Sequence, residues 1–469
     1  MNHIESILKI KKGELSSLEY LEKFIDQINK KEDEINAFIT LNEEKAREKA
    51  KEIDKKINNG KEVGKLAGTP IAIKDSIITK NLRTTCGSQM LKDFSPQYDA
   101  DVIKKIKKED GIIIGKTNCD EFCMGTSTET SYFGPTHNPI DHEKVPGGSS
   151  GGSAAAIKYG ASPFSLGSDT GGSVRCPASF CGTVGLKPTY GSISRYGLIA
   201  YASSLDQIGT ITNTIEESAY LFDVIKGKTK NDSTSLKYPD RDVYEELDTD
   251  ISQKTIGVPQ EFFGEGVDQE VNEEVKKSIK DLEDQGAKIK SVNIPSMEYA
   301  LAAYYLVAIG EASSNLARFD GVRYGHYSNK NKDWEDYFSE VRREGFGKEV
   351  KRRIMLGTYA LSAGYYEKYY QKALKIRTLL KNDFERALNE SDLLVAPTMP
   401  FKPFELGEKI EDPLSLYFAD ILTVPINMVG LPALSVPSKE EDIGIQIIGE
   451  PFSEGEILST GKIIEEENQ

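Results

Sequence analysis

Three short segments of the sequence combine residue types that could cleave an amide or ester bond. Lys74 ends the apolar β-type run IAIK, where desolvation favours the neutral amine that can accept a proton. Residues 146–153 (PGGSSGGS) place Ser149 between pairs of glycines. Residues 167–175 (GSDTGGSVR) place Ser173 directly after two glycines, whose backbone N–H groups can fold around an oxyanion. A serine nucleophile needs a base, and because the chain has only four histidines, Lys74 is the candidate.

Two glycine-rich segments have alternative interpretations. Residues 111–117 (GIIIGKT) resemble a phosphate-binding loop, but that motif has four residues between its glycines and this segment has three. We therefore predict a strand that leads into a turn. Residues 147–151 (GGSSG) match the GxSxG turn of α/β-hydrolases, whose triad ends on a later histidine. The only later histidine is His326, in a charged, aromatic stretch typical of a surface or contact helix, so a triad with His326 is the weaker alternative.

The overall composition excludes several classes of protein. The 469 residues include 59 Lys and Arg against 74 Asp and Glu, a net charge of −15 that disfavours direct binding to nucleic acid or anionic lipid. Neither a membrane span nor a signal peptide is evident, so we expect a cytoplasmic protein. Five cysteines are few and odd in number, which predicts small buried side chains rather than disulfides or a metal site.

The elements around these segments follow an α/β pattern. Amphipathic helices are predicted over residues 16–36 and 41–58, and the order strand, helix, strand over residues 71–74, 101–110 and 111–115 is typical of an α/β sheet. An alanine-rich helix is expected after Ser153, with the glycines at its N-terminus. Further strands are predicted at 255–258, 287–292, 393–396, 433–436 and 444–448, and further helices at 268–285, 296–319 and 358–388.

Taken together, the lysine, the GGSSGGS segment and the DTGGSVR segment resemble the amidase signature family. Lys74 and Ser149 are 75 residues apart, and Ser149 and Ser173 are 24 apart. Four further segments resemble the A subunits of tRNA-dependent amidotransferases: residues 120–139, 204–209, 313–325 and 352–357. The resemblance covers nearly the whole chain.

The resemblance implies a fold and a domain organisation. The expected fold class is α/β, with a central mixed, twisted β-sheet covered by helices on both faces. We expect one amidase-signature domain over residues 1–469. Within it, residues 1–60 would be an N-terminal helical segment, 61–210 the catalytic signature core, and 211–469 the remaining sheet and helical cover with the glutamine-binding segments.

The resemblance also implies roles for individual residues. Ser173 would be the nucleophile, Ser149 a bridging serine on a cis peptide bond, and Lys74 the base that draws a proton through Ser149. The oxyanion hole would consist of the backbone amides of Thr170, Gly171, Gly172 and Ser173. Glutamine would be gripped by Tyr304, Arg353 and Asp420, with Tyr305 and Arg352 as adjacent alternatives. Asp169 and Arg175 could form a buried structural pair rather than contact the substrate.

The activity that the resemblance implies is glutamine hydrolysis within a heterotrimer. The chain would supply ammonia to a tRNA-binding B subunit, a kinase that uses ATP and Mg²⁺ to amidate Glu-tRNA(Gln), Asp-tRNA(Asn) or both, and a small C subunit would complete the complex. The acidic chain would bind neither a metal nor another cofactor, and tRNA would contact mainly the partner. The alternatives are a stand-alone amidase for another small amide and a catalytically silent scaffold protein within the complex.

Overall fold

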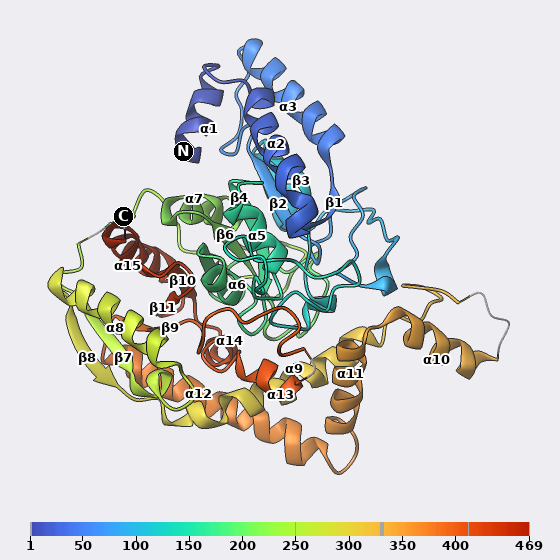
Figure 1. Ribbon diagram of the computed structural model, residues 1–469, viewed down its shortest axis with the longest axis vertical. Coiled ribbons are helices and arrows are strands. Elements are labelled where there is room, and N and C mark those ends of the chain that lie inside the picture. Colours follow the sequence, from blue (N-terminus) through green and yellow to red (C-terminus); the bar gives the residue numbers. More distant parts are fainter. Residues whose placement is uncertain (1, 249, 329–332, 411, 469) are drawn as a thin grey trace.

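One mixed β-sheet runs through the part of the chain that the computed structural model describes, residues 2–248, 250–328, 333–410 and 412–468 (Figure 1). Its 11 strands lie in the order β1-β3-β2-β4-β6-β5-β10-β11-β9-β7-β8. β2 pairs in parallel with β3 and β4, whereas the pairings from β4 through β6, β5, β10 and β11 to β9 are antiparallel. The strands are β1 (Phe38–Leu41), β2 (Pro70–Lys74), β3 (Ile112–Thr117), β4 (Phe164–Asp169), β5 (Val184–Lys187), β6 (Gln207–Thr212), β7 (Thr255–Pro259), β8 (Lys288–Val292), β9 (Leu393–Pro397), β10 (Ala433–Pro437) and β11 (Gly444–Ile448).

Helices cover both faces of the sheet, as expected for this fold class. Ile71 and Ile73 of β2 pack in one hydrophobic core with α4 and α7 (Ile215–Ile225), whereas Ala72 packs in another core with α2, α3 and α5. β2 is therefore buried on both faces, which explains its apolar sequence before Lys74. The helices before β5 are α1 (His3–Lys11), α2 (Ser17–Ile35), α3 (Glu43–Asn58), η1 (Gln89–Leu91), α4 (Asp101–Lys108), η2 (Glu121–Cys123), α5 (Gly151–Lys158) and α6 (Arg175–Phe180).

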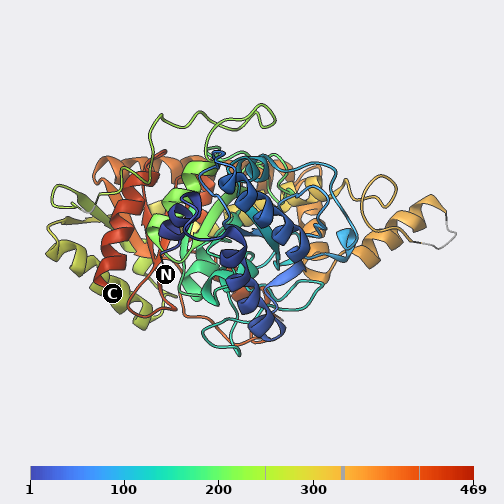
Figure 2. The same cartoon turned by 90° about the horizontal axis from the view of Figure 1, so that it is seen from above.

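The second half of the chain adds a larger helical cover. In Figure 1, α9, α11 and α12 lie below the sheet, and Figures 1 and 2 both show α10 extending away from the rest of the chain. None of the helices in the described residues is long and apolar enough to cross a membrane. These helices are α7 (Ile215–Ile225), η3 (Gln260–Phe263), α8 (Gln269–Asp284), η4 (Pro295–Tyr299), α9 (Ala300–Leu316), α10 (Trp334–Gly345), α11 (Lys348–Ala360), η5 (Tyr366–Tyr370), α12 (Gln371–Asn389), α13 (Pro413–Phe418), α14 (Val424–Val429) and α15 (Glu454–Glu467).

Most predicted elements are confirmed, and one helix is not. The segment that resembles a phosphate loop is the strand β3, and the five later strands lie where the pattern placed them. The single helix predicted over residues 358–388 is wrong, because α11 ends at Ala360 and α12 begins at Gln371. Gly364 between them has φ +84°, which a right-handed helix cannot contain, and a short π-helical turn, η5, follows.

Candidate active site

The buried end of β2 brings Lys74 against Ser149. The Lys74 side chain is fully buried, and its Nζ donates a hydrogen bond of 2.7 Å to Ser149 Oγ and one of 3.3 Å to the carbonyl oxygen of Ser168. Ser168 lies on β4, the strand beside β2, so two neighbouring strands fix the position of the amine. The Gly148–Ser149 peptide bond is cis, as the resemblance implied.

Ser173 lies in a tight loop between β4 and α6, and its side chain is almost completely buried. Asp169 shapes this loop, because its carboxylate accepts hydrogen bonds from the backbone N–H groups of Gly172 (2.8 Å) and Val174 (3.1 Å). Gly172 has φ +135°, a backbone conformation that residues with a side chain rarely adopt. The Gly172 N–H donates to Asp169 in this structure, and the expected oxyanion role of the amides of Thr170, Gly171, Gly172 and Ser173 stays a prediction.

Tyr304, one of the predicted glutamine-binding residues, packs directly on this loop. A Cβ added at Gly171 would lie 2.3 Å from the Tyr304 hydroxyl oxygen, so a glycine is required there. Tyr305, the residue after Tyr304, instead donates a hydrogen bond of 2.7 Å to Asp420 Oδ2. The adjacent tyrosines therefore both border the site, one at the serine loop and the other at Asp420.

Arg353 lies in a sheath of aromatic rings. Its Nη1 donates to the Tyr201 hydroxyl at 2.7 Å, its Nε donates to Glu349 at 2.8 Å, and the Tyr417 ring centroid lies 5.2 Å from its guanidinium carbon. The alternative, Arg352, is only half-buried and pairs with the other carboxylate oxygen of Glu349, Oε2. The buried position of Arg353 favours it over Arg352 as the arginine of the site.

Burial also sets the charge of Asp420. The side chain is 8% exposed, and burial raises its pKa to about 7, although the hydrogen bond from Tyr305 and the charge of Arg353 both act to lower it. The carboxyl is thus partly protonated at neutral pH. A cation bound beside it would favour the charged form.

Asp169 and Arg175 form a buried ion pair, as predicted. Arg175 donates to both carboxylate oxygens of Asp169 at 3.1 Å, and both side chains are completely buried. The same guanidinium donates to Asn427 Oδ1 at 2.5 Å and to Gln446 Oε1 at 2.6 Å. The role of Arg175 is therefore structural, because its N–H groups donate to protein oxygens.

Several residues of the site carry no signal in the sequence. Tyr201 and Glu349 hold Arg353, and Thr423 donates a hydrogen bond of 2.6 Å from its Oγ1 to the carbonyl oxygen of Gly171. Thr423 is 252 residues from Gly171 along the chain. These are common residue types outside any motif, so only the fold identifies them.

The alternative assignments find no support in the geometry. His326 lies in a surface loop rather than in a helix, and its ring nitrogen contacts Glu344 at 3.1 Å. All five cysteines are buried free thiols, as expected. Within the described ranges, His, Cys, Asp and Glu side chains form no cluster of three or more that could hold a metal ion.

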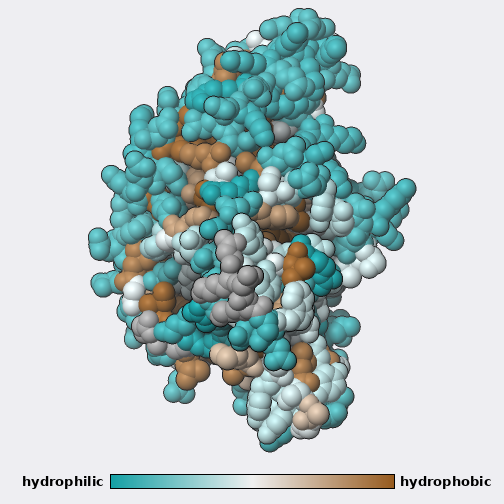
Figure 3. Space-filling model, turned by 90° about the vertical axis from the view of Figure 1, so that its right-hand side faces the viewer, coloured by the Kyte–Doolittle hydropathy of each residue, from teal (hydrophilic) through white to brown (hydrophobic). Residues whose placement is uncertain are grey.

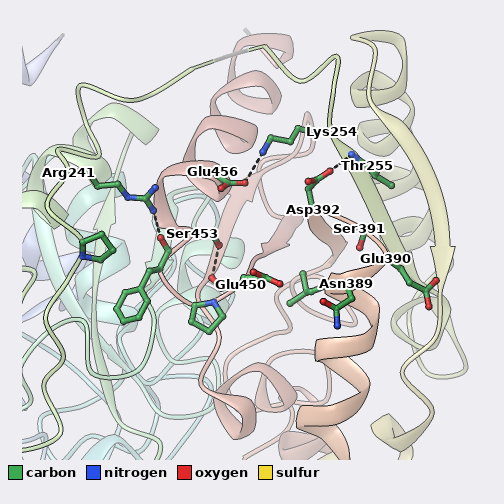
Figure 4. A pocket seen from close by; sticks show the side chains of 14 residues that line it. Arg241, Lys254, Thr255, Asn389, Glu390, Ser391, Asp392, Glu450, Ser453 and Glu456 are labelled. Atoms are coloured by element: carbon green, nitrogen blue, oxygen red, sulfur yellow. Dashed lines mark hydrogen bonds and ion pairs between the residues drawn. The ribbon is translucent and has the colours of Figure 1, made fainter.

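A separate pocket of about 650 Å³ lies between the starts of β7 and β9 and the N-terminal end of α15 (Figure 4). It contains none of the predicted site residues. Lys254 pairs with Glu456 at 2.9 Å, and Asp392 accepts from the backbone N–H of Thr255 at 2.7 Å. These polar groups bind one another, so the pocket is not the candidate active site.

The family follows from this fold and site together with the comparison of sequences. The amidase family profile matches residues 19–458, and the chain belongs to the amidase family. The A subunit of the glutamyl-tRNA(Gln) amidotransferase of Thermoanaerobacter pseudethanolicus is 53% identical over 98% of this chain and 95% of that protein. The protein of the same name from Methanosarcina barkeri is 54% identical, with the same coverage.

Solved structures support the same assignment. The crystal structure of the A subunit of glutamyl-tRNA(Gln) amidotransferase from Thermotoga maritima has a TM-score of 0.82 and 41% identity, over 99% of this chain and 94% of that chain. A crystal structure of an amidase has a TM-score of 0.84 at 27% identity and covers both chains completely. The resemblance inferred from the sequence is confirmed.

Proposed function

We propose that this chain is the glutaminase component, or A subunit, of a tRNA-dependent amidotransferase. It hydrolyses glutamine to glutamate and supplies ammonia to a partner protein. The observation that carries the proposal is the hydrogen bond between buried Lys74 and Ser149, beside the glycine-rich loop of Ser173 on which Tyr304 packs. The names of relatives that are 53% and 54% identical over nearly the full length support the same activity.

The chemistry begins with Ser173 as the nucleophile. Its Oγ attacks the carbonyl carbon of the glutamine side chain while its proton passes to Ser149, whose own hydroxyl proton passes to the amine of Lys74. The backbone N–H groups of Thr170, Gly171, Gly172 and Ser173 stabilise the oxyanion. The same relay returns a proton to the leaving nitrogen, and ammonia departs. Water then attacks the acyl-enzyme, glutamate leaves, and Ser173 regains its proton.

Glutamine recognition uses the predicted residues Tyr304, Arg353 and Asp420. Arg353 binds the α-carboxylate, because a guanidinium can donate two parallel hydrogen bonds to a carboxylate. Asp420 binds the α-ammonium group, and Tyr304 borders the substrate at Gly171. The aromatic rings around Arg353 exclude water and strengthen its attraction for a carboxylate.

The partners follow from the proposed activity. The B subunit binds tRNA, uses ATP and Mg²⁺ to activate the Glu or Asp on Glu-tRNA(Gln) or Asp-tRNA(Asn), and receives the ammonia, and the small C subunit completes a heterotrimer. The net charge of −15 is consistent with tRNA binding mainly to the partner. The chain itself needs no cofactor for amide hydrolysis. Its proposed role with tRNA corresponds to a cytoplasmic protein.

The proposal is tested on the complex of this chain with its two partners. Ser173→Ala, Ser149→Ala and Lys74→Met should each lower the rate of glutamine hydrolysis by at least about three orders of magnitude, because each removes a member of one relay. The thermal midpoints should stay close to wild type. Equal, negligible hydrolysis by wild type and Ser173→Ala would instead support the scaffold. A preference for another amide, with no need of partners, would support the stand-alone amidase.

A further inference from the structure

Helix α11 has large apolar side chains on its outer face as well as a packed inner face. Val350, Arg353, Gly357 and Ala360 are buried, and a Cβ at Gly357 would lie 2.0 Å from a carbonyl oxygen of α9. The outward side chains Met355, Leu356 and Tyr359 are 67%, 46% and 50% exposed. Their spacing gives one continuous stripe on the helix surface. A helix that is apolar on both faces is normally covered on both sides.

The stripe continues into the turn that follows the helix. The Tyr359 and Tyr365 rings lie 4.4 Å apart, and Tyr365 stacks on Tyr369 at 5.9 Å. At the lower end of Figure 3, this part of the surface is pale and brown, whereas the upper part is mostly teal. A hollow of about 380 Å³ lies between Tyr366 and Tyr370 of the same turn and α9. The docking face is defined by Met355, Leu356, Tyr359, Tyr365 and Tyr369.

Two lysines, Lys351 and Lys368, border the docking face, although the whole chain is acidic. Residues 348–381 contain nine Lys and Arg and only two Glu, against a net charge of −15 for the chain, and of these cations Arg352 and Arg353 pair with Glu349 and Arg353 is buried. Lys351 and Arg352 lie one helical turn before Met355 and Leu356. Lys368 lies 5.4 Å from the centroid of the Tyr369 ring. The apolar stripe is thus bordered by Lys351 and Lys368, and by Arg352 in its ion pair with Glu349.

We propose that the docking face binds a partner protein that presents an apolar stripe bordered by carboxylates. The partner would bury Met355 and Leu356 and pair with the flanking cations, an arrangement typical of protein interfaces rich in aromatic and apolar anchors. RNA would neutralise the cations and stack on the tyrosines but would leave the Met and Leu side chains exposed. A second copy of this chain in a symmetric contact would bring like charges together.

This inference rests on the proposed function, which supplies the two partner proteins as candidates. Arg353 lies on the inner side of the same helix, 3% exposed. A partner that covers the outer side therefore fixes the helix that carries the predicted glutamine-binding arginine.

The test compares two exposed leucines. Leu356 on the docking face and Leu8 on α1 are 46% and 48% exposed, so Leu356→Glu and Leu8→Glu introduce the same charge at equally exposed positions. The dissociation constant for the purified pair of tRNA-binding and small subunits is measured by sedimentation. Leu356→Glu should weaken binding by about tenfold or more, whereas Leu8→Glu should change it less than twofold. Both variants should keep the thermal midpoint of wild type.

A second variant covers the case in which Leu356→Glu fails to fold. Lys368→Glu, at an exposed site, should also weaken binding, and the loss should shrink at high salt. Binding like that of wild type by the folded variants overturns the inference. Loss of binding to labelled tRNA alone, or loss of self-association alone, also overturns it. If the variants behave as expected but wild type shows no glutaminase activity, the docking face stands and the proposed function fails.

Discussion

At the scale of single residues, the proposed ionic recognition of glutamine depends on a buried carboxyl. Burial raises the pKa of Asp420 to about 7, so the group is ionised above this pH and neutral below it. A neutral Asp420 cannot attract the α-ammonium group. We therefore expect kcat/KM for glutamine to fall as the pH drops below about 7, approaching a tenfold loss per pH unit, in a pH–rate profile measured from pH 5.5 to 8.5.

Asp206 provides the control for this pH dependence. Burial also raises its pKa to about 7, but its carboxylate accepts from Thr170 Oγ1 at 2.7 Å and has no proposed contact with substrate. Asp420→Asn should lower kcat/KM and remove the acidic limb, whereas Asp206→Asn should keep it. An acidic limb that survives in Asp420→Asn would show that another group controls binding.

Thr423 offers a second test at this scale. Its hydroxyl donates to the Gly171 carbonyl, on the loop that carries Ser173, and Thr423→Val removes that hydrogen bond at nearly constant volume. We expect kcat to fall by about 10- to 100-fold with KM within threefold, because the loop must hold the oxyanion donors in place. Steady-state kinetics would check this. Thr423→Ser should restore most of kcat, and equal kinetics in all three proteins would exclude a positioning role.

The residues that sequence analysis found and missed differ in a simple physical way. Lys74, Ser149 and Ser173 lie in glycine-rich or β-type segments whose local composition already suggests their environment. Thr423 and Tyr201 act through single contacts to distant segments, and neither lies in an unusual local pattern. Their roles therefore depend on tertiary structure, which residue spacing alone does not contain.

At the scale of elements, the strands could be predicted from local sequence, whereas the break between two long helices could not. β9, β10 and β11 are mostly apolar because helices cover both sheet faces, so a short apolar run identified each of them. The break between α11 and α12 was missed because apolar and aromatic residues continue through it. Gly364 was the only local signal for the break, and the close approach of α11 to α9 at Gly357 had none.

That close approach gives a prediction at the element scale. In Gly357→Ala, the new methyl group would clash with the Ile309 carbonyl oxygen, so α11 must move away from α9. We expect a loss of about 1–3 kcal/mol in the free energy of unfolding, measured by urea denaturation, and a higher KM for glutamine because α11 carries Arg353.

A second helical glycine serves as the control for this substitution. Gly455, in α15, has its nearest neighbour 3.9 Å from an added Cβ. Gly455→Ala should raise the free energy of unfolding by up to about 1 kcal/mol, since alanine favours the helix. If both alanine variants gained stability, the contact between α11 and α9 would be looser than the structure indicates.

At the scale of the whole molecule, one sheet spans residues from all three segments expected from the sequence, 1–60, 61–210 and 211–469. This arrangement is consistent with a single domain, which stays a prediction. Arg175 connects distant parts of the chain at the centre of the sheet. It binds Asp169 at the end of β4, Asn427 in α14 and Gln446 in β11.

Arg175→Met should therefore weaken the whole fold. It leaves the buried Asp169 without its cation, so we expect the free energy of unfolding to fall by about 3–5 kcal/mol, measured by denaturant titration at pH 7. Adding Asp169→Asn removes the uncompensated charge and should recover part of this stability. It should not recover glutamine hydrolysis, because Asp169 also shapes the loop of Ser173.

The pH dependence of this effect distinguishes charge from packing. Burial alone would raise the pKa of Asp169, but Arg175 holds it well below its usual value. In wild type the resulting stability is therefore present above about pH 4, the pKa of an unfolded aspartate, and is lost only as the pH falls through the lower folded-state pKa. In Arg175→Met the pKa of Asp169 should instead rise above the unfolded value. Its protonation on acidification should then stabilise the folded variant, so the difference from wild type should narrow between pH 7 and pH 5. A constant difference would mean that Arg175 acts through packing alone.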